Sequence, residues 1–155
     1  MIRNSTIGLA AWLVVSLAAG WFGSRYAPGE WYASLVKPPW TPPSAVFAPV
    51  WTTLYVMMGV AAWLVWRRAG FSGAALPLTL FVAQLILNAL WSYIFFGRHL
   101  PGPAFIEIVA LWLVILATLV SFWRVRPLAG ALLLPYLFWV GFASGLNLQL
   151  WRLNA

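Results

Sequence analysis

Side chains able to act as acids, bases or metal ligands are scarce in this chain of 155 residues. It has one histidine, His99, two acidic residues, Glu30 and Glu107, and no cysteine. Disulfides and thiolate-bound metals are therefore excluded, and a metal site built from several such ligands is not expected. Glu107 falls inside an apolar segment, where a carboxylate is a functional candidate by default, but no second acid lies near it for paired-carboxylate chemistry. His99 stands in a loop beside Arg98, and we interpret it as a solvated residue rather than a metal ligand.

Amide and aromatic side chains instead recur at helical spacing within apolar segments. Residues three, four, seven or eight positions apart share one face of a helix, and side chains that lipid would penalise point to the bundle interior. A cavity lined in this way suits a large, flat, mostly apolar ligand with a few polar edges. The residues are Trp51 and Tyr55 in one segment, Gln84, Asn88 and Trp91 in a second, and Trp139, Ala143 and Asn147 in a third.

The amides also have an alternative explanation, as hydrogen-bonding links between helices. For Gln84 and Asn88 considered alone, we favour that explanation. The coincidence of three such faces beneath one unusual loop favours a binding pocket instead.

That loop, residues 31–43, contains four prolines, three aromatic residues and one lysine. Proline fixes φ near −65° and restricts the residue before it, so the pairs Pro38-Pro39 and Pro42-Pro43 form a stiff backbone. A connector between helices needs only a few polar residues. We therefore interpret the loop as a shaped lid over the mouth of a helix bundle.

The composition indicates that most of the surface around this lid faces lipid. The chain is 64% hydrophobic and 7% charged, against about 25% charged residues in typical soluble domains, and its mean hydropathy is +0.90. A spanning helix needs about 20 mainly apolar residues. Five segments meet this requirement, at approximately 5–22, 44–66, 74–96, 103–123 and 128–153.

The net charge of +7 would suggest nucleic acid in a soluble protein. Here the cations flank apolar segments, where they meet anionic headgroups, so we expect a lipid bilayer and no nucleic acid as partner. Five crossings place Arg3, Arg67, Arg68, Arg124 and Arg126 on one side of the membrane, and Arg25, Lys37, Arg98 and Arg152 on the other.

The connections after the second, third and fourth segments are short, which makes neighbouring helices antiparallel. The sequence therefore predicts an all-α membrane protein, a single bundle of five transmembrane helices over residues 1–155 with a long structured first loop, the lid 23–43. Pro135 lies inside the fifth segment and should kink it, because it removes a backbone hydrogen bond.

Five motifs are distributed over nearly the whole chain. They are Trp31-Tyr32-x-x-Leu35-x-Lys37-Pro38-x-Trp40-x-Pro42-Pro43, Pro49-x-Trp51 with Tyr55, Gln84-x-x-x-Asn88-x-x-Trp91, Pro135-Tyr136-x-x-Trp139 and Leu146-Asn147-x-x-x-Trp151-Arg152-Leu153-Asn154. Taken together, these motifs resemble the TspO/MBR family, the tryptophan-rich sensory proteins and translocator proteins, also called peripheral-type benzodiazepine receptors.

The resemblance implies a small five-helix membrane protein, often a homodimer, that binds tetrapyrroles such as protoporphyrin IX or haem as ligands, with no obligatory cofactor. The resemblance also implies a role as sensor, carrier or scavenger in tetrapyrrole or stress regulation. By position, and with Trp40 and Gln84 added from the patterns above, the predicted ligand-binding residues are Tyr32, Trp40, Pro42, Trp51, Tyr55, Gln84, Asn88, Trp91, Trp139, Ala143 and Leu146.

Two alternatives remain open. One is light-dependent degradation of protoporphyrin IX, with Trp51 and Trp139 as photochemical candidates and no conventional catalytic residue. The other is a sterol- or lipid-binding translocator or regulatory scaffold, also able to take benzodiazepine-type ligands. The ring beside Arg152 is Trp151 rather than the Tyr of the sterol motif in animal members, which weakens the sterol alternative. Helical spans favour a bacterial inner membrane over an outer one.

Overall fold

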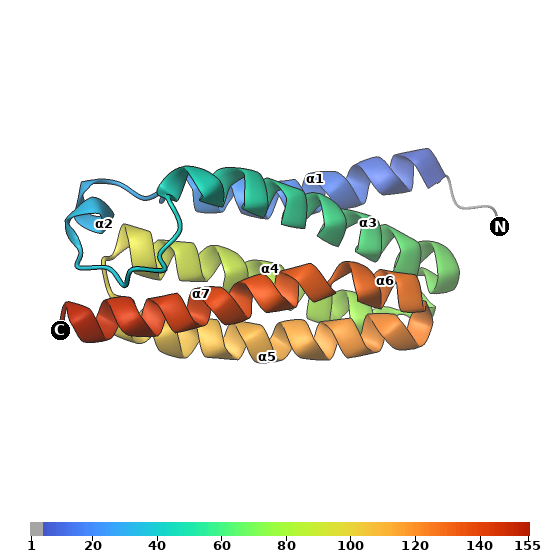
Figure 1. Cartoon of the computed structure of the whole chain (residues 1–155). Coiled ribbons are helices and arrows are strands. Elements are labelled where there is room, and N and C mark those ends of the chain that lie inside the picture. Colours follow the sequence, from blue (N-terminus) through green and yellow to red (C-terminus); the bar gives the residue numbers. More distant parts are fainter. Residues whose placement is uncertain (1–4) are drawn as a thin grey trace.

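A computed structural model describes residues 5–155, and α-helices form most of this part of the chain. The bundle is elongated, with the start of α1 and the end of α7 at opposite ends (Figure 1). Within this described part, five helical stretches are long and apolar enough to cross a membrane, which confirms the predicted all-α membrane fold. They are α1 (Ser5–Ser24), η1 (Ser44–Val46) with α3 (Phe47–Gly73), α4 (Ala75–Ser92) with the π-helical turn η2 (Tyr93–Gly97), α5 (Pro101–Val125), and α6 (Pro127–Leu132) with α7 (Leu134–Leu153).

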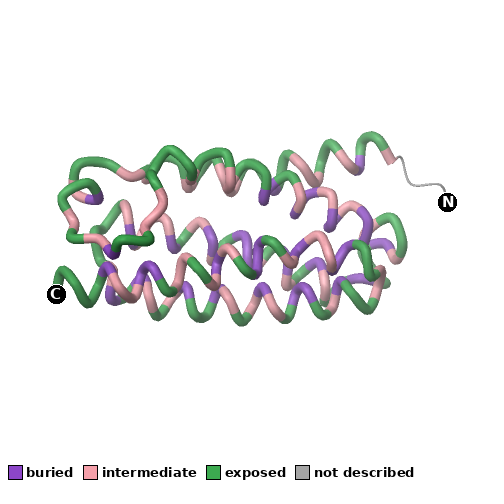
Figure 2. The backbone as a smooth tube through the Cα atoms, viewed as in Figure 1, coloured by how far each residue is buried: buried purple, intermediate pink, exposed green. Residues whose placement is uncertain are grey.

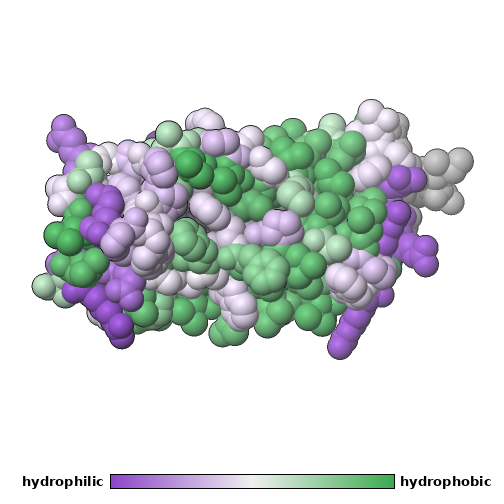
Figure 3. Space-filling view, in the orientation of Figure 1, coloured by the Kyte–Doolittle hydropathy of each residue, from purple (hydrophilic) through white to green (hydrophobic). Residues whose placement is uncertain are grey.

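The helices surround a common interior. α1 packs on α3 and α4, α4 packs on α5, α5 packs on α6 and α7, and α3 packs on α6. Buried residues face this interior while exposed residues cover its outside (Figure 2). Hydrophilic residues gather at the two ends, and hydrophobic residues cover most of the surface between them (Figure 3), as a bilayer-spanning bundle requires.

Helix ends differ from the sequence-based prediction at residues 67–73, which we expected to be a connection. α3 continues to Gly73, and its helical geometry breaks only at Gly70, with φ 71° and ψ −179°. Arg67 and Arg68 are good helix formers, and Gly70 supplies a positive φ that other residues rarely adopt. The break therefore falls at the glycine and not at the first charged residue. Arg3 of the predicted charge distribution lies outside the described residues.

Pro135 does not kink the fifth span at its own position, although the sequence predicted a kink there. The fifth span divides at Leu133, and Pro135 occupies the first turn of α7, where a proline without an N–H is tolerated. The Leu137 N–H still bonds to the Leu133 carbonyl at 3.0 Å. The span therefore consists of two helices that meet at Leu133.

The lid contains a short helix, α2 (Glu30–Ser34), that the proline pattern did not predict. α2 contacts the link between η2 and α5, where the Trp31 ring stacks on His99 with centroids 4.5 Å apart and planes 7° apart. His99 is exposed and adopts φ 57°. Its ring is therefore an attachment point for the lid, at the end of the bundle where α7 ends.

Candidate functional site

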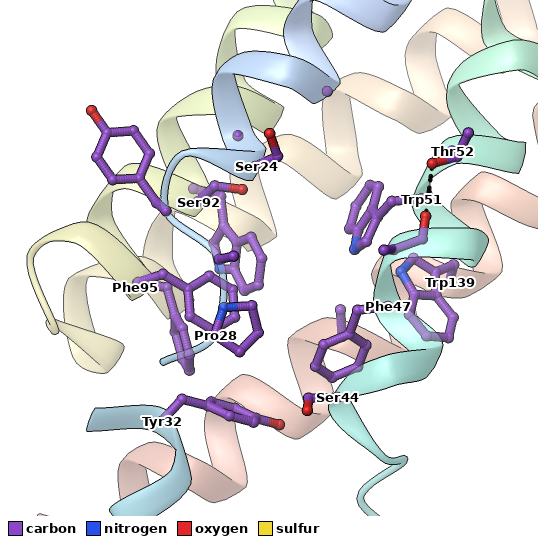
Figure 4. A pocket seen from close by; sticks show the side chains of 18 of the residues that line it. Ser24, Pro28, Tyr32, Ser44, Phe47, Trp51, Thr52, Ser92, Phe95 and Trp139 are labelled. Atoms are coloured by element: carbon purple, nitrogen blue, oxygen red, sulfur yellow. Dashed lines mark hydrogen bonds between the residues drawn. The ribbon is translucent and has the colours of Figure 1, made fainter. Parts of the chain in front are cut away.

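A cavity of about 570 Å³ lies under the lid, between α1, α3, the end of α4 with η2, and α7. Figure 4 shows Trp51 and Trp139 side by side on one wall, Pro28 and Phe95 on the opposite wall, and Tyr32 near Ser44 and Phe47 at the lid. The volume of the cavity falls within the ~300–1,000 Å³ usual for small-molecule sites.

Most of the predicted ligand-binding residues lie on the wall of this cavity. The aromatic ones stand in contact: the Trp51 ring lies 5.7 Å from Tyr55 and 6.4 Å from Trp139 between centroids. The predicted residues that line the cavity are Tyr32, Trp51, Tyr55, Trp91, Trp139, Ala143 and Leu146.

Gln84 and Asn88 do not line the cavity; they belong to a buried hydrogen-bond network below it. The Asn88 side chain accepts a bond from the Tyr55 hydroxyl and donates one of 2.7 Å to Tyr136. The Tyr136 hydroxyl donates to Gln84 at 2.6 Å. The amides therefore link α3, α4 and α7, as their alternative explanation proposed.

Trp40 and Pro42 also lie away from the cavity wall. Trp40 is 49% exposed and packs edge-on against Phe142 of α7, with centroids 5.6 Å apart. The part of the lid that reaches the cavity is its first half, around Pro28 and Tyr32. The proline-rich second half runs outside it, because hydrogen bonds between Val36 and Asn154 tie it to the end of α7.

Sequence reasoning missed the contribution of α1, which lines the cavity with Leu17, Gly20 and Trp21. α1 is largely apolar, and its buried residues are the small Gly8 and Ser16; the Ser16 hydroxyl donates to the Tyr55 carbonyl of α3 at 2.6 Å. The usable signal was the pair Ser16 and Gly20, four residues apart and so on one face of the helix: a Cβ at Gly20 would lie 2.6 Å from the Tyr55 ring. A glycine in the middle of a spanning segment often marks such a close approach.

Two buried polar atoms on the cavity wall have no hydrogen-bond partner: the Tyr32 hydroxyl and the Trp139 indole Nε1. Burial raises the pKa of the Tyr32 phenol, so it keeps its proton and can donate. Buried donors are rarely left unpaired. The wall therefore presents aromatic surface with two donors available to acceptor atoms of a guest.

Cations stand one ring away from the cavity. The Arg25 guanidinium lies 5.8 Å from the centroid of Trp21, and the Lys37 ammonium 4.8 Å from that of Tyr32, and both rings line the cavity. Arg98 instead donates to the Tyr93 hydroxyl at 3.3 Å. Arg25 and Lys37 thus place positive charge near the mouth.

Neither Glu107 nor His99 is part of the cavity wall. Both carboxyl oxygens of Glu107 are buried without a partner. Within residues 5–155, no group of three or more His, Asp or Glu side chains could hold a metal ion. The cavity offers stacking surface and hydrogen-bond donors rather than an acid–base pair.

Comparisons with known proteins agree with the motifs. Residues 7–152 match the model of the TspO/MBR family. The chain is 41% identical over 146 residues to Protein CrtK of Rhodobacter capsulatus, covering 94% of this chain and 91% of that protein. It is 42% identical over 160 residues to Tryptophan-rich protein TspO of Chlorobaculum tepidum, covering 99% of each. It is 44% identical over 137 residues to the Homo sapiens Translocator protein, covering 85% of this chain and 81% of that protein.

Proposed function

The chain belongs to the TspO/MBR family, and from this premise we propose that it binds a tetrapyrrole such as protoporphyrin IX in the cavity under the lid. It is an integral, multi-pass membrane protein. In the proposal, the bound tetrapyrrole makes it a sensor, carrier or scavenger of that molecule.

The observation that carries the proposal is an aromatic cavity with two unpartnered donors, the Tyr32 hydroxyl and Trp139 Nε1. A porphyrin is a wide aromatic plane, and rings that line the wall offer it stacking area. Its two carboxylates carry negative charge, and Arg25 and Lys37 lie one ring behind the wall near the mouth. Charge-assisted hydrogen bonds to them are about twice as strong as neutral ones.

The side chains on the wall offer haem iron no strong ligand. They include no histidine, cysteine or methionine, which are common axial ligands of haem iron. Tyrosine can also be such a ligand, but the buried Tyr32 phenol keeps its proton. Aromatic stacking and hydrogen bonding hold the two forms equally well. We therefore expect protoporphyrin IX to bind at least as tightly as haem.

Titration of the protein in lipid nanodiscs with protoporphyrin IX, followed by tryptophan fluorescence quenching, tests the proposal. We expect saturable binding, weakened about tenfold or more in Trp51→Leu and Trp139→Leu because each loses stacking area and, for Trp139, a donor. Trp123→Leu is the matched control, since Trp123 is 45% exposed on α5 and does not line the cavity. A linear, unsaturable response, or equal affinities in all three variants, would refute the proposal.

A second candidate is light-dependent degradation of protoporphyrin IX. The observation in its favour is the contact of two oxidisable indoles on the cavity wall, Trp51 and Trp139, at 6.4 Å between centroids. Illumination of the complex should then bleach the porphyrin absorbance faster than in Trp51→Phe or Trp139→Phe. Bleaching at the same rate in both variants would leave binding alone.

A further inference from the structure

One flank of the cavity lacks backbone packing. Around the bundle, α1 packs on α3 and α4, α4 on α5, and α5 on α7, but α3 packs on the fifth span mainly through α6, and no extended packing joins α3 to α7. α6 lies at the end of the bundle away from the lid (Figure 1). The cavity lies at the lid end, where this flank is therefore closed by side chains.

The side chains that close it are four aromatic residues, which we call the α3/α7 flank: Phe47 and Trp51 of α3, and Trp139 and Phe142 of α7. The Trp139 ring meets Phe47 at 6.3 Å and Trp51 at 6.4 Å, both edge-on, and Phe142 at 5.5 Å. All four line the cavity. Among the described residues that line the cavity, no hydrogen bond joins α3 to α7.

The lid is held by hydrogen bonds as well as by ring contacts, whereas ring contacts alone close this flank. Two hydrogen bonds of 2.9 Å join Val36 to Asn154, and Trp31 stacks on His99. The Tyr32 ring packs against Phe47 and Phe96 at centroid distances of 6.2 and 5.6 Å. A ligand that passed the lid would have to separate hydrogen bonds and stacked rings together.

The outside of the α3/α7 flank is suited to lipid. Phe138 and Phe142 of α7 are 71% and 37% exposed, and the mid-section of this face is mostly hydrophobic (Figure 3). The four flank residues carry no charge, and the hydroxyl of the exposed Thr52 beside Trp51 is paired with the Ala48 carbonyl at 2.8 Å. A planar apolar molecule dissolved in the hydrocarbon therefore meets no charged side chain among them. Side-chain rotations are fast compared with the displacement of an ordered segment.

We propose that the ligand enters and leaves sideways from the bilayer, between α3 and α7, with Trp139 and Phe142 as the rings that swing aside. Phe142 then leaves its edge-on contact with Trp40 of the lid, while the Val36–Asn154 hydrogen bonds keep the lid closed. This route rests on the proposed function, because it needs a ligand in the cavity. It identifies the ligand pool as the one dissolved in the membrane.

The natural absence of cysteine allows each route to be locked selectively. The pair Ala48→Cys and Ala143→Cys places thiols on cavity-lining positions of α3 and α7, for bis-methanethiosulfonate reagents of graded length. The pair Val36→Cys and Asn154→Cys replaces the lid contact by a disulfide or a short cross-link. Each protein is loaded with protoporphyrin IX in nanodiscs, then cross-linked, and release to excess empty liposomes is followed by porphyrin fluorescence.

The lateral cross-link should slow release by about tenfold or more, since it acts on the dissociation rate, and reduction should restore it. The lid cross-link should leave release unchanged. Single-cysteine variants treated with the same reagent control for the label. Unchanged release after lateral cross-linking, or slowing by the lid cross-link to the same extent, would overturn the lateral route.

A substitution without cross-linking gives an independent readout. Phe142→Ala should accelerate uptake and release together, by about threefold to tenfold, with a smaller change in the dissociation constant. Phe138→Ala is the control, because Phe138 lies on the same helix but does not line the cavity. If Phe142→Ala binds normally and its uptake and release rates are unaltered, the lateral route is contradicted but the proposed function is not. If the unmodified protein does not bind protoporphyrin IX, both the proposed function and the route are refuted.

Discussion

Asn154 holds Val36 through both backbone polar groups of that residue. The Asn154 side-chain oxygen accepts from the Val36 N–H, and its nitrogen donates to the Val36 carbonyl, each at 2.9 Å. The same nitrogen also donates to the Leu150 carbonyl at 2.8 Å. One amide thus joins the lid to the last turn of α7, across 118 positions of sequence.

Asn154→Ala should loosen the lid without unfolding the bundle. Exposed hydrogen bonds each contribute about 0.5–1.5 kcal/mol, so we expect a drop in global stability of about 1 kcal/mol and a larger local effect. Hydrogen exchange of the backbone amides of residues 33–40 should accelerate, as measured by mass spectrometry in nanodiscs.

Two further variants control this result. Arg152→Ala alters an exposed residue on the same turn of α7 and should leave lid exchange unchanged. Asn154→Asp keeps an acceptor for the Val36 N–H but turns a second acceptor toward the Val36 carbonyl, so it should also accelerate exchange. Protection of residues 33–40 that persists in Asn154→Ala would show that the lid is held by other contacts.

Asn88→Leu should destabilise the bundle more than Gln84→Leu. Loss of Asn88 leaves the Tyr55 hydroxyl without its acceptor and removes one partner of Tyr136, whereas loss of Gln84 removes only the acceptor of Tyr136 and a 3.9 Å contact with Met58. Interhelical hydrogen bonds in membranes are worth about 0.6 kcal/mol each and at most about 1.7. Thermal unfolding in detergent should therefore rank wild type above Gln84→Leu and Gln84→Leu above Asn88→Leu.

Ligand titration of the same variants separates a structural role from a binding one. Neither amide lines the cavity, so surviving folded protein should bind protoporphyrin IX within about threefold of wild type, a difference below 1 kcal/mol. An affinity loss of Asn88→Leu that exceeds its stability loss would place Asn88 in contact with the ligand after all.

These amides illustrate how far the sequence could predict the site. The spacing of Gln84, Asn88 and Trp91 correctly indicated an inward face of the third span, because intramembrane polar groups avoid lipid. It could not distinguish a cavity wall from a hydrogen-bond network, since that depends on hydroxyls that Tyr55 and Tyr136 bring from other helices. The alternative favoured for the amides alone is the one found.

The lid and α1 also show that contacts between distant segments limit what the sequence can predict. Prolines indicated a stiff loop, but the direction of its two halves depends on contacts with Asn154 and His99, which are distant in sequence. Trp40 therefore lies outside the cavity. In α1 only Ser16 and Gly20 mark the inner face, and the role of two small residues becomes evident only from their packing on Tyr55.

Gly20→Ala should disturb the cavity, whereas Gly29→Ala should not. A Cβ at Gly20 would lie 2.6 Å from the Tyr55 ring, while one at Gly29 would meet nothing within 4 Å. Forced repacking costs about 1–3 kcal/mol, partly offset by the better helix propensity of alanine. We expect a lower unfolding temperature and weaker protoporphyrin IX binding for Gly20→Ala only, measured by differential scanning fluorimetry and fluorescence titration. Equal behaviour of the two variants would mean that Tyr55 moves aside without consequence.

Trp139→Phe and Trp91→Phe should have opposite effects on the unliganded protein. Trp139 Nε1 is buried without a partner, so its removal deletes an unsatisfied donor and should leave stability unchanged or raise it slightly. Trp91 Nε1 donates to Asn147 at 2.9 Å, so its removal leaves a buried acceptor unpaired and should cost about 1–3 kcal/mol of stability.

Ligand affinity should respond to Trp139→Phe even though stability does not. We expect the Trp139 N–H to bond to protoporphyrin IX, so the affinity of Trp139→Phe should fall about fivefold to thirtyfold, or 1–2 kcal/mol. Unfolding temperatures and titrations of both variants check this, and an unchanged affinity in Trp139→Phe would show that its N–H stays unpaired in the complex.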